Sequence, residues 1–288
     1  MRVTIVHETV YRYESPAHYS VQYLRLSPPT TGRQKVISWK IDAPAPVRHW
    51  VDTFGNDSHL LVVDKPHTEI RVRARGDVEV HETPVIEEAG PQSLDVYLRG
   101  TPLTASDANL TTFANDFRSI VEKDRREGLI KMMGSLRERI EYKGGVTHAA
   151  TAATDAFARG AGVCQDHAHV FLASCRTLGV PARYVSGYLA ADRNAQLASH
   201  AWVEAWVPDE GWQGYDIANN TKPGVRHVRV AVGLDYLDAC PVRGYRRGGQ
   251  GESLEVDVQV FDGRRARQVD KAQQAQQSLP LQQAQAQQ

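Results

Sequence analysis

The first hundred residues alternate along the chain, with apolar or aromatic positions recurring every second residue. The positions on one side of these runs are Val3, Ile5, Thr9, Tyr11, Tyr13, Ile37, Trp39, Ile41, Ile70, Val72 and Ala74. Alternation with a period of two is typical of half-buried strands. Between Val51 and Val63, the tripeptide Gly55-Asn56-Asp57 tolerates positive φ and predicts a hairpin turn. We therefore expect an antiparallel β-sandwich over residues 1–100.

After about Thr101 the spacing of the apolar residues becomes helical. Ser106 or Asp107 can cap a first helix, and a second helix follows it. The apolar positions of the two helices are Leu110, Phe113, Ala114, Phe117, Leu129, Met132, Met133, Leu136 and Ile140. A Gly-rich connection over residues 143–147 comes next, and strands are expected at about 182–189 and 201–207. Helices followed by strands predict an α+β second domain over residues 105–245.

The C-terminal residues divide into a last strand and a tail. A strand at about Leu254–Phe261, within residues 246–264, is expected to pack back on either domain. Residues 265–288 are mostly Gln and Ala and offer almost no apolar face. Such a segment buries too little surface to offset its ordering entropy, so the tail is predicted to be disordered.

Composition places the chain among ordinary soluble proteins. Its 288 residues suffice for one or two domains. Lys plus Arg and Asp plus Glu both number 34, so no overall field favours nucleic acid or a membrane surface as a partner. The sequence shows neither a signal peptide nor the roughly 20 apolar residues of a membrane span. Its three widely spaced cysteines imply no disulfide framework, and the expected location is the cytoplasm.

One cysteine lies where a helix is predicted to begin. The apolar positions Ala168, Phe171, Leu172, Cys175 and Leu178 recur at steps of three and four. This helix begins at about Cys164, after two glycines, and ends at Gly179. A helix N-terminus offers free amides and the positive end of the dipole, which favour a thiolate and can hold an oxyanion. The ordinary alternative is a small buried residue, as most free cysteines are; Cys175 fits that description, and Cys240 has no predicted role.

A base and an acid follow the cysteine in the sequence. His200 opens a strand on which Trp202, Glu204 and Trp206 point to the same side. Asp216 ends the next strand, where it could accept the imidazole N–H and fix the ring. With eleven histidines in the chain, a surface role is the ordinary alternative for any one of them. A lone Asp before a loop is usually a turn residue.

These three segments together resemble the motifs of the transglutaminase-like superfamily. The matching stretches are Gly162-Val-Cys-Gln-Asp-His-Ala-His169, Ser199-His-Ala-Trp-Val-Glu204 and Gly211-Trp-Gln-Gly-Tyr-Asp216, with the His 36 residues after the Cys and the Asp 16 after the His. The resemblance extends to bacterial members with an N-terminal β domain. It is carried there by residues 7–13, 24–28, 52–56, 226–236 and 241–244, and so covers roughly residues 1–262.

The resemblance implies a papain-like α+β core in which Cys164 is the nucleophile, His200 the base and Asp216 the residue that orients it. It implies thioester chemistry on a peptide or protein substrate, with no cofactor and no metal. The sequence leaves open whether water or an amine accepts the acyl group, and it leaves open the natural substrate, calcium dependence and oligomeric state. His167 stands where the family pattern has an apolar or aromatic residue. It is predicted to face solvent or, alternatively, to modulate the site.

Two other functions remain open. A zinc hydrolase would use Cys164, His167, His169 and His200, but a helix that places Cys164 and His167 on one face displaces His169 from it. The second is a catalytically silent binding module whose β domain is the working part. An intact triad argues against it.

Overall fold

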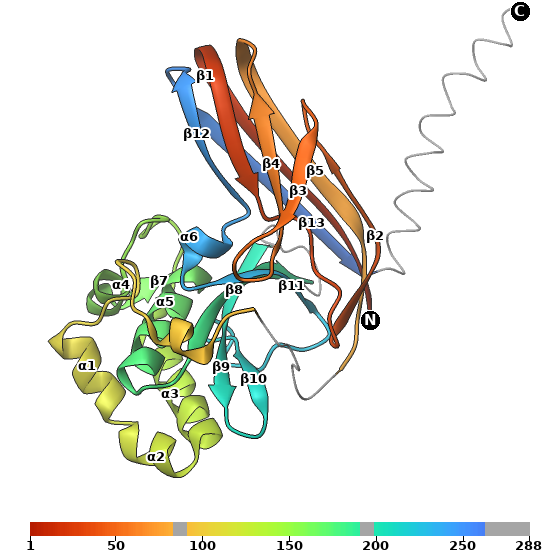
Figure 1. The fold of residues 1–288 in the computed structure, drawn as a ribbon. Helices are drawn as coiled ribbons and strands as arrows, with labels where there is room; N and C mark the ends of the chain where they lie inside the picture. The colour runs from red at the N-terminus through yellow and green to blue at the C-terminus, as the bar shows by residue number, and fades with distance from the viewer. Residues whose placement is uncertain (83–90, 191–198, 263–288) are drawn as a thin grey trace, which may run out of the picture.

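The computed structural model describes residues 1–82, 91–190 and 199–262. It has the α+β fold class expected from the sequence. A curled antiparallel sheet forms one part of the molecule, and a smaller sheet covered by helices forms the other (Figure 1). No helix in these ranges combines the length and apolar character that crossing a bilayer requires.

The larger sheet is built around one long strand. Its seven strands are β1 (Arg2–Leu24), β2 (Gln34–Asp42), β3 (Val47–Val51), β4 (Asp57–Val63), β5 (His67–Val80), β12 (Val242–Gly248) and β13 (Ser253–Asp262). The first half of β1 lies between β5 and β13, and its second half lies between β4 and β12. The register shifts between Arg12 and Ala17, where irregular pairing lets a strand bend. The strands expected in a sandwich are thus hydrogen-bonded into one curled sheet.

The C-terminal strands complete this N-terminal sheet. The strand expected at about 254–261 is β13, which pairs with β1 from Val3 to Arg12. Residues 242–245, placed within the second domain from the sequence, instead begin β12 and pair with Tyr23 and its neighbours on β1. Hydrophobic alternation identifies a strand without identifying its partner, so the sequence did not show that both C-terminal strands join the N-terminal sheet. The Gln- and Ala-rich tail at 265–288 lies outside the described residues.

The second part packs helices against a four-stranded sheet (Figure 1). The sheet has the order β10-β9-β8-β11 and consists of β8 (Ala182–Leu189), β9 (Ser199–Val207), β10 (Gly211–Tyr215) and β11 (His227–Gly233). The helices are η1 (Leu94–Leu98), α1 (Ala108–Asn115), α2 (Arg118–Lys123), α3 (Arg125–Arg139), α4 (Ala153–Arg159), α5 (Cys164–Thr177) and α6 (Tyr236–Ala239). Two short parallel strands, β6 (Glu141–Tyr142) and β7 (Ala161–Gly162), precede α5.

Helix α5 is the centre of this second part. Its apolar stripe packs against the sheet on one side and against α1, α3 and α4 on the other, and Ala168, Phe171, Leu172 and Cys175 all belong to the buried core. Asp107, one of the two expected caps, accepts a hydrogen bond from the Leu110 N–H at 2.8 Å and starts α1. Because the body of α5 is buried in this core, the position of its first turn is fixed.

Two amide side chains from the N-terminal sheet bind the edge strand β11. Gln34 donates to the Arg229 carbonyl at 2.8 Å and accepts from the Arg229 N–H at 2.9 Å. Asn56 makes the same pair of bonds with Val232, both at 2.8 Å. Each amide replaces the backbone partner that a further strand would supply. A buried apolar cluster, which includes Val3 and Tyr188, seals the same interface.

The segment Asp52–Asn56, which overlaps the hairpin turn predicted at Gly55-Asn56-Asp57, joins the antiparallel strands β3 and β4 as predicted and presents Asn56. The Asp52 carboxylate accepts from the N–H groups of Phe54 and Asn56 at 3.0 Å each, and from the Arg25 guanidinium at 2.9 Å. Gly55 has a φ of 83°, which side chains other than glycine rarely adopt. This motif therefore serves the contact between the two parts.

Replacing Asn56 by alanine is expected to lower the free energy of unfolding by about 3 kcal/mol, since each buried backbone group left without a partner costs about 1–3 kcal/mol. Urea denaturation followed by circular dichroism measures the change. Exposed Gln259, whose amide donates to the nearby Asp257 at 2.9 Å, provides the control, and Gln259→Ala should stay within about 0.5 kcal/mol. Equal stability of the two variants would contradict the structural role of Asn56.

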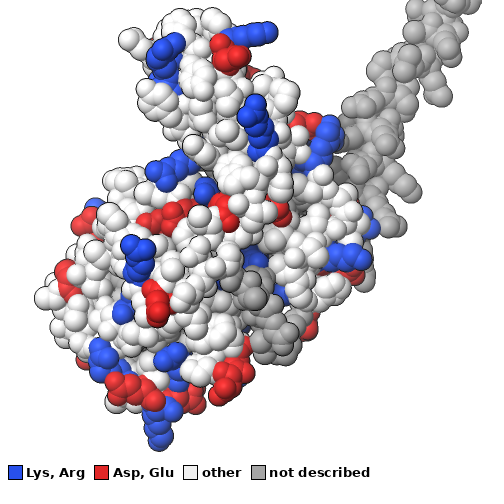
Figure 2. Space-filling view, in the orientation of Figure 1, with Lys and Arg blue, Asp and Glu red and all other residues white. Residues whose placement is uncertain are grey.

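Charged side chains of both signs are interspersed over the face of the molecule shown in Figure 2. The chain has a formal net charge of zero, and on that face positive and negative side chains lie among one another.

Candidate active site

Cys164 is the first residue of α5 and is only partly buried, whereas Cys175 and Cys240 are buried. Asp166, two residues on, accepts from the Val163 N–H at 2.7 Å and from the Thr147 hydroxyl at 2.7 Å, which fixes the start of the helix. First-turn amides have no acceptor earlier in the helix, and the dipole adds positive potential there. The thiol therefore occupies the position predicted for it, where a thiolate and an oxyanion are both favoured.

His200 and Asp216 come from neighbouring strands of the small sheet. His200 is the second residue of β9, and Asp216 follows β10 directly. The His200 Nε2 lies 2.8 Å from Asp216 Oδ2. The Cys164 side chain lies close enough to the His200 ring to raise the pKa of that ring. Because Nε2 is engaged with Asp216, Nδ1 is the nitrogen that remains for Cys164. The structure thus brings the three predicted residues together.

Two further residues contact the same carboxylate and were not predicted. His227, the first residue of β11, places its Nε2 3.0 Å from Asp216 Oδ2. Asn219 donates its side-chain amide to Oδ2 at 2.7 Å and its backbone N–H to Oδ1 at 3.2 Å. In the sequence, His227 belonged to a stretch used only for the resemblance. Its one local signal was a histidine at the head of an apolar strand, the same arrangement as His200.

The electrostatics of the site follow from these contacts. Burial alone would lower the pKa of His200, but hydrogen bonds and charges from Asp216 and Cys164 outweigh it and raise the pKa to about 9. Burial alone would raise the pKa of Asp216, but the bonds from His200 and His227 hold it well below its usual range. At neutral pH a charged imidazole ring therefore lies beside the thiol and a carboxylate beside the ring.

The pKa of His200 sets an expected alkaline limit of activity. If a charged His200 must deliver a proton to the leaving amine, kcat/KM for an amide donor should fall as pH rises through about 9. Initial rates between pH 6 and 11, in buffers of constant ionic strength, measure this limb. A fall centred near 6.5, the ordinary value for histidine, would show that Asp216 and Cys164 do not stabilise the charged ring.

The donor atoms of His200, Asp216 and His227 all lie within 4.8 Å of one another, a spacing that metal ligands could also have. The Gly224 N–H, however, donates to His227 Nδ1 at 3.1 Å. This bond leaves the ring proton on Nε2, the atom that faces Asp216. A metal ion would have to displace that proton, so the arrangement fits a hydrogen-bonded cluster better than a metal centre.

The zinc set considered from the sequence is not assembled. His167 is fully buried, and its ring nitrogens face the carbonyl oxygens of Val163 at 2.9 Å and Ile140 at 3.0 Å. The Nε2 of His169 accepts from the Tyr236 N–H at 3.2 Å. The prediction that His167 faces solvent was wrong. Tyr142 on β6 stacks on its ring, a contact that helical periodicity alone does not reveal.

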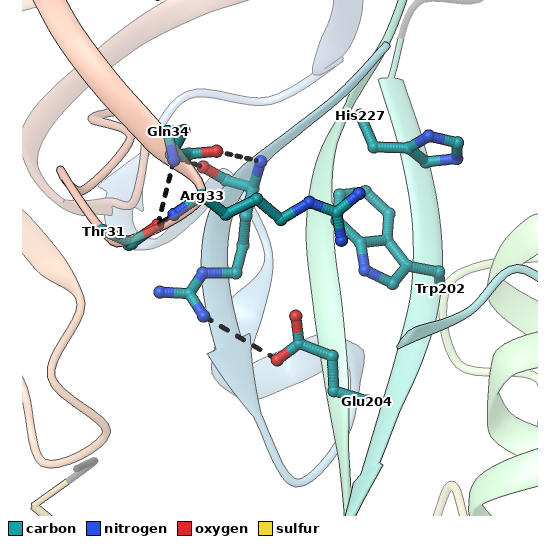
Figure 3. Close-up of a pocket in the computed structure, with 7 residues that line it drawn as sticks. Thr31, Arg33, Gln34, Trp202, Glu204 and His227 are labelled. Atoms are coloured by element: carbon teal, nitrogen blue, oxygen red, sulfur yellow. Dashed lines mark hydrogen bonds and ion pairs between the residues drawn. The ribbon is translucent and has the colours of Figure 1, made fainter. Parts of the chain in front are cut away.

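A small cavity lies next to the site and shares His227 with it (Figure 3). Its volume of about 10 Å³ suits a single water molecule, and its lining consists of Thr31, Arg33, Gln34, Trp202, Glu204, His227 and Arg229. Glu204 is buried there, with its carboxylate 2.6 Å from the Arg183 guanidinium and 3.7 Å from that of Arg229. The strand that carries His200 therefore also carries a member of a buried ionic cluster.

Comparisons with known proteins agree over both parts of the chain. Residues 111–217 match the transglutaminase-like superfamily, and residues 3–79 match the bacterial transglutaminase-like N-terminal region. An uncharacterized protein of Mycobacterium leprae is 31% identical over 277 residues, which cover 90% of this chain and 98% of that protein. A protein-glutamine gamma-glutamyltransferase of Pseudomonas aeruginosa is 33% identical over 82 residues, 26% of this chain and 12% of that enzyme.

Among solved structures, a candidate cysteine protease from Cytophaga hutchinsonii superposes with a TM-score of 0.68 and covers 91% of each chain. Its sequence identity is 20%, so this likeness concerns the fold.

Proposed function

Because the chain belongs to the transglutaminase-like superfamily, in its bacterial form with a strand-rich N-terminal region, we propose that it is a thiol-dependent acyl-transfer enzyme. One observation carries the proposal. The His200 ring bonds Asp216 through Nε2 at 2.8 Å and lies close enough to the thiol of Cys164, the first residue of α5, for the two groups to act on each other's charge. This is the geometry of an activated nucleophile with an oriented base.

In the proposed first step, the Cys164 thiolate attacks the carbonyl carbon of a peptide bond or a glutamine carboxamide. The negative oxygen that forms is held by the Cys164 N–H and one further donor. As the C–N bond breaks, His200 gives its Nδ1 proton to the departing amine or ammonia. The acyl group is then a thioester on Cys164, and Asp216 keeps the His200 ring oriented.

In the second step, His200 takes a proton from water or from an amine as that acceptor attacks the thioester. Water gives a carboxylic acid, an amine gives a new amide, and in both cases the C–S bond breaks and the thiolate returns. We favour hydrolysis, because a cross-linking enzyme must shield its thioester from water. Trp202 and Trp212 are buried in packing contacts, so neither forms an exposed shield.

The substrate class we propose is a peptide or protein carrying a carboxamide. The test incubates the protein with glutamine-containing peptides and with unmodified peptide libraries, then quenches in acid and seeks an acyl adduct on Cys164 by mass spectrometry. Hydroxylamine should release the same acyl group as a hydroxamate. Cys164→Ala is the matched control. Absence of any adduct across both donor classes, in a protein whose Cys164 still reacts selectively, would contradict the enzymatic proposal and favour a binding module.

The acceptor is decided in the same assay. If hydrolysis is the reaction, the carboxylic acid formed with water should exceed the amide formed with a primary amine, when the amine is present at millimolar concentration. Predominant transfer to the amine would overturn our preference for hydrolysis and favour a transglutaminase.

Cys164 is expected to react with iodoacetamide faster than the other two cysteines near neutral pH. It is partly exposed beside His200, whereas burial raises the pKa of the thiols of Cys175 and Cys240 and so disfavours their thiolates. Peptide mapping after brief labelling measures the three rates. Comparable labelling of all three would argue against a specially activated thiol.

A further inference from the structure

The ring of His227 is buried against the catalytic acid and held there as a neutral donor. Only 7% of the residue is exposed. The Gly224 N–H donates to Nδ1 at 3.1 Å, so the ring proton is on Nε2, which lies 3.0 Å from Asp216 Oδ2. Burial lowers the pKa of His227 below its ordinary value, which agrees with a neutral ring. The Trp202 ring packs against it nearly at a right angle, with 5.3 Å between ring centroids.

One carboxylate oxygen of Asp216 serves three donors. Oδ2 receives the Nε2 groups of His200 at 2.8 Å and His227 at 3.0 Å, and the Asn219 amide at 2.7 Å. Donors that share one acceptor oxygen weaken one another, because each draws on the same negative charge. They also fix the rotation of the carboxylate. His227 therefore acts on His200 in two ways through Asp216. It fixes the position of the Asp216 carboxylate, and it reduces the negative charge that this carboxylate offers to His200.

We propose that His227 is a positioning residue of the acyl-transfer site, which holds Asp216 Oδ2 toward His200 and moderates its charge so that His200 can release a proton to the leaving amine. This inference rests on the proposed function of Cys164, His200 and Asp216. Asp216 is the shared acceptor of the cluster, since His200, His227 and Asn219 all donate to its Oδ2.

The N-terminal part supports His227 from both sides along the chain. The Arg33 guanidinium donates to the Pro223 carbonyl, next to the Gly224 N–H that bonds the His227 ring. Gln34 pairs with both backbone groups of Arg229, two residues beyond His227. The segment before and at the start of β2 thus links the N-terminal sheet to the orientation of Asp216.

The ionisable groups facing the two rings come from five elements. His200 faces Cys164 from α5 and Asp216 from the end of β10. His227 faces Asp216, His200 from β9, and Arg33 from the loop before β2. Tyr142 on β6 is close enough to Cys164 and Asp216 for their charges to act on its hydroxyl. Removing the His227 donor leaves all these groups in place, so a change in the titration of His200 reports on the bond to Asp216.

Two variants separate the hydrogen bond from the packing. His227→Phe keeps a ring against Trp202 and loses both nitrogens, whereas His227→Gln keeps an amide that can donate to Asp216. We expect His227→Phe to lower kcat about tenfold, the effect of about one hydrogen bond, with KM unchanged within about twofold. The alkaline limb of kcat/KM should move to higher pH in His227→Phe, because His200 then faces a carboxylate with one donor fewer. His227→Gln should restore both quantities.

A readout that needs no substrate accompanies the kinetics. Titration of ¹³C-labelled histidine followed by NMR gives the pKa of His200 in the wild type and in both variants, with thermal melts as the check on folding. A rise in His227→Phe that His227→Gln reverses supports the proposal. An unchanged His200 titration in a folded His227→Phe protein overturns it, even if turnover falls.

Failure of the proposed function has a different signature. In that case the wild type forms no thioester with any donor, and the NMR titration still decides whether His227 moderates Asp216. A wild type that forms the thioester, with His227→Phe equal to it in kcat and in pH profile, overturns only the role of His227.

Discussion

Asp216→Ala should lower kcat by about 10³–10⁴-fold, the scale seen when a triad loses its orienting acid. The variant removes the acceptor that holds His200 at 2.8 Å. It also removes one of the two partners that raise the pKa of His200 to about 9, so that pKa should fall and less of the ring should be charged at pH 7. The measurement is turnover of whichever donor forms the Cys164 thioester, with circular dichroism to show that the fold remains.

The controls for this prediction separate chemistry from folding. Asp216→Asn keeps the shape of the side chain and should lose nearly as much activity, since an amide cannot stabilise the imidazolium. Asp155→Ala removes an exposed carboxylate in the first turn of α4 and should leave turnover unchanged. Activity of Asp216→Ala within a few-fold of wild type would make Asp216 a turn residue, whose carboxylate merely caps the Asn219 N–H.

Glu204→Gln is expected to lower the free energy of unfolding by about 3–5 kcal/mol, because breaking a buried ion pair leaves charge without its counter-ion. The Glu204 side chain is 1% exposed and accepts from the Arg183 Nε at 2.8 Å, with the Arg229 guanidinium 3.7 Å away. Urea denaturation at pH 7 measures the loss. Glu210→Gln is the matched control: its carboxylate pairs with Arg126 at the surface and should contribute less than about 1 kcal/mol.

The same carboxylate gives the stability a pH dependence of known sign. Burial raises the pKa of Glu204, but the charges of Arg183 and Arg229 outweigh it and hold the pKa below its ordinary value. The stabilisation is therefore present above the unfolded pKa of about 4.3 and is lost as pH falls through the folded pKa. In Glu204→Gln, the part of the unfolding free energy that is lost as pH falls through the folded pKa of Glu204 should be missing. A difference from wild type below about 1 kcal/mol at pH 7 would contradict a net stabilising role.

The sequence alone determined those features that depend on residues close together in the chain. The three- and four-residue spacing after Cys164 predicted α5 and placed the thiol at its N-terminus, because a helix repeats every 3.6 residues whatever surrounds it. His200 and Asp216 could also be paired in advance. They lie on two strands joined by a tight turn at Asp209–Gly211, and such strands are neighbours in a sheet.

Only the tertiary structure decided which distant segments meet. Alternation marked the N-terminal strands, but it did not show that β12 and β13 return to flank β1. Likewise, nothing near His227 in the chain indicates that its ring reaches Asp216, or that Gln34 and Asn56 bind β11. A periodic pattern states which face of a strand is buried and leaves its partner open. These contacts arise only when the N-terminal sheet packs on the edge of the small sheet, and they complete the surroundings of Asp216.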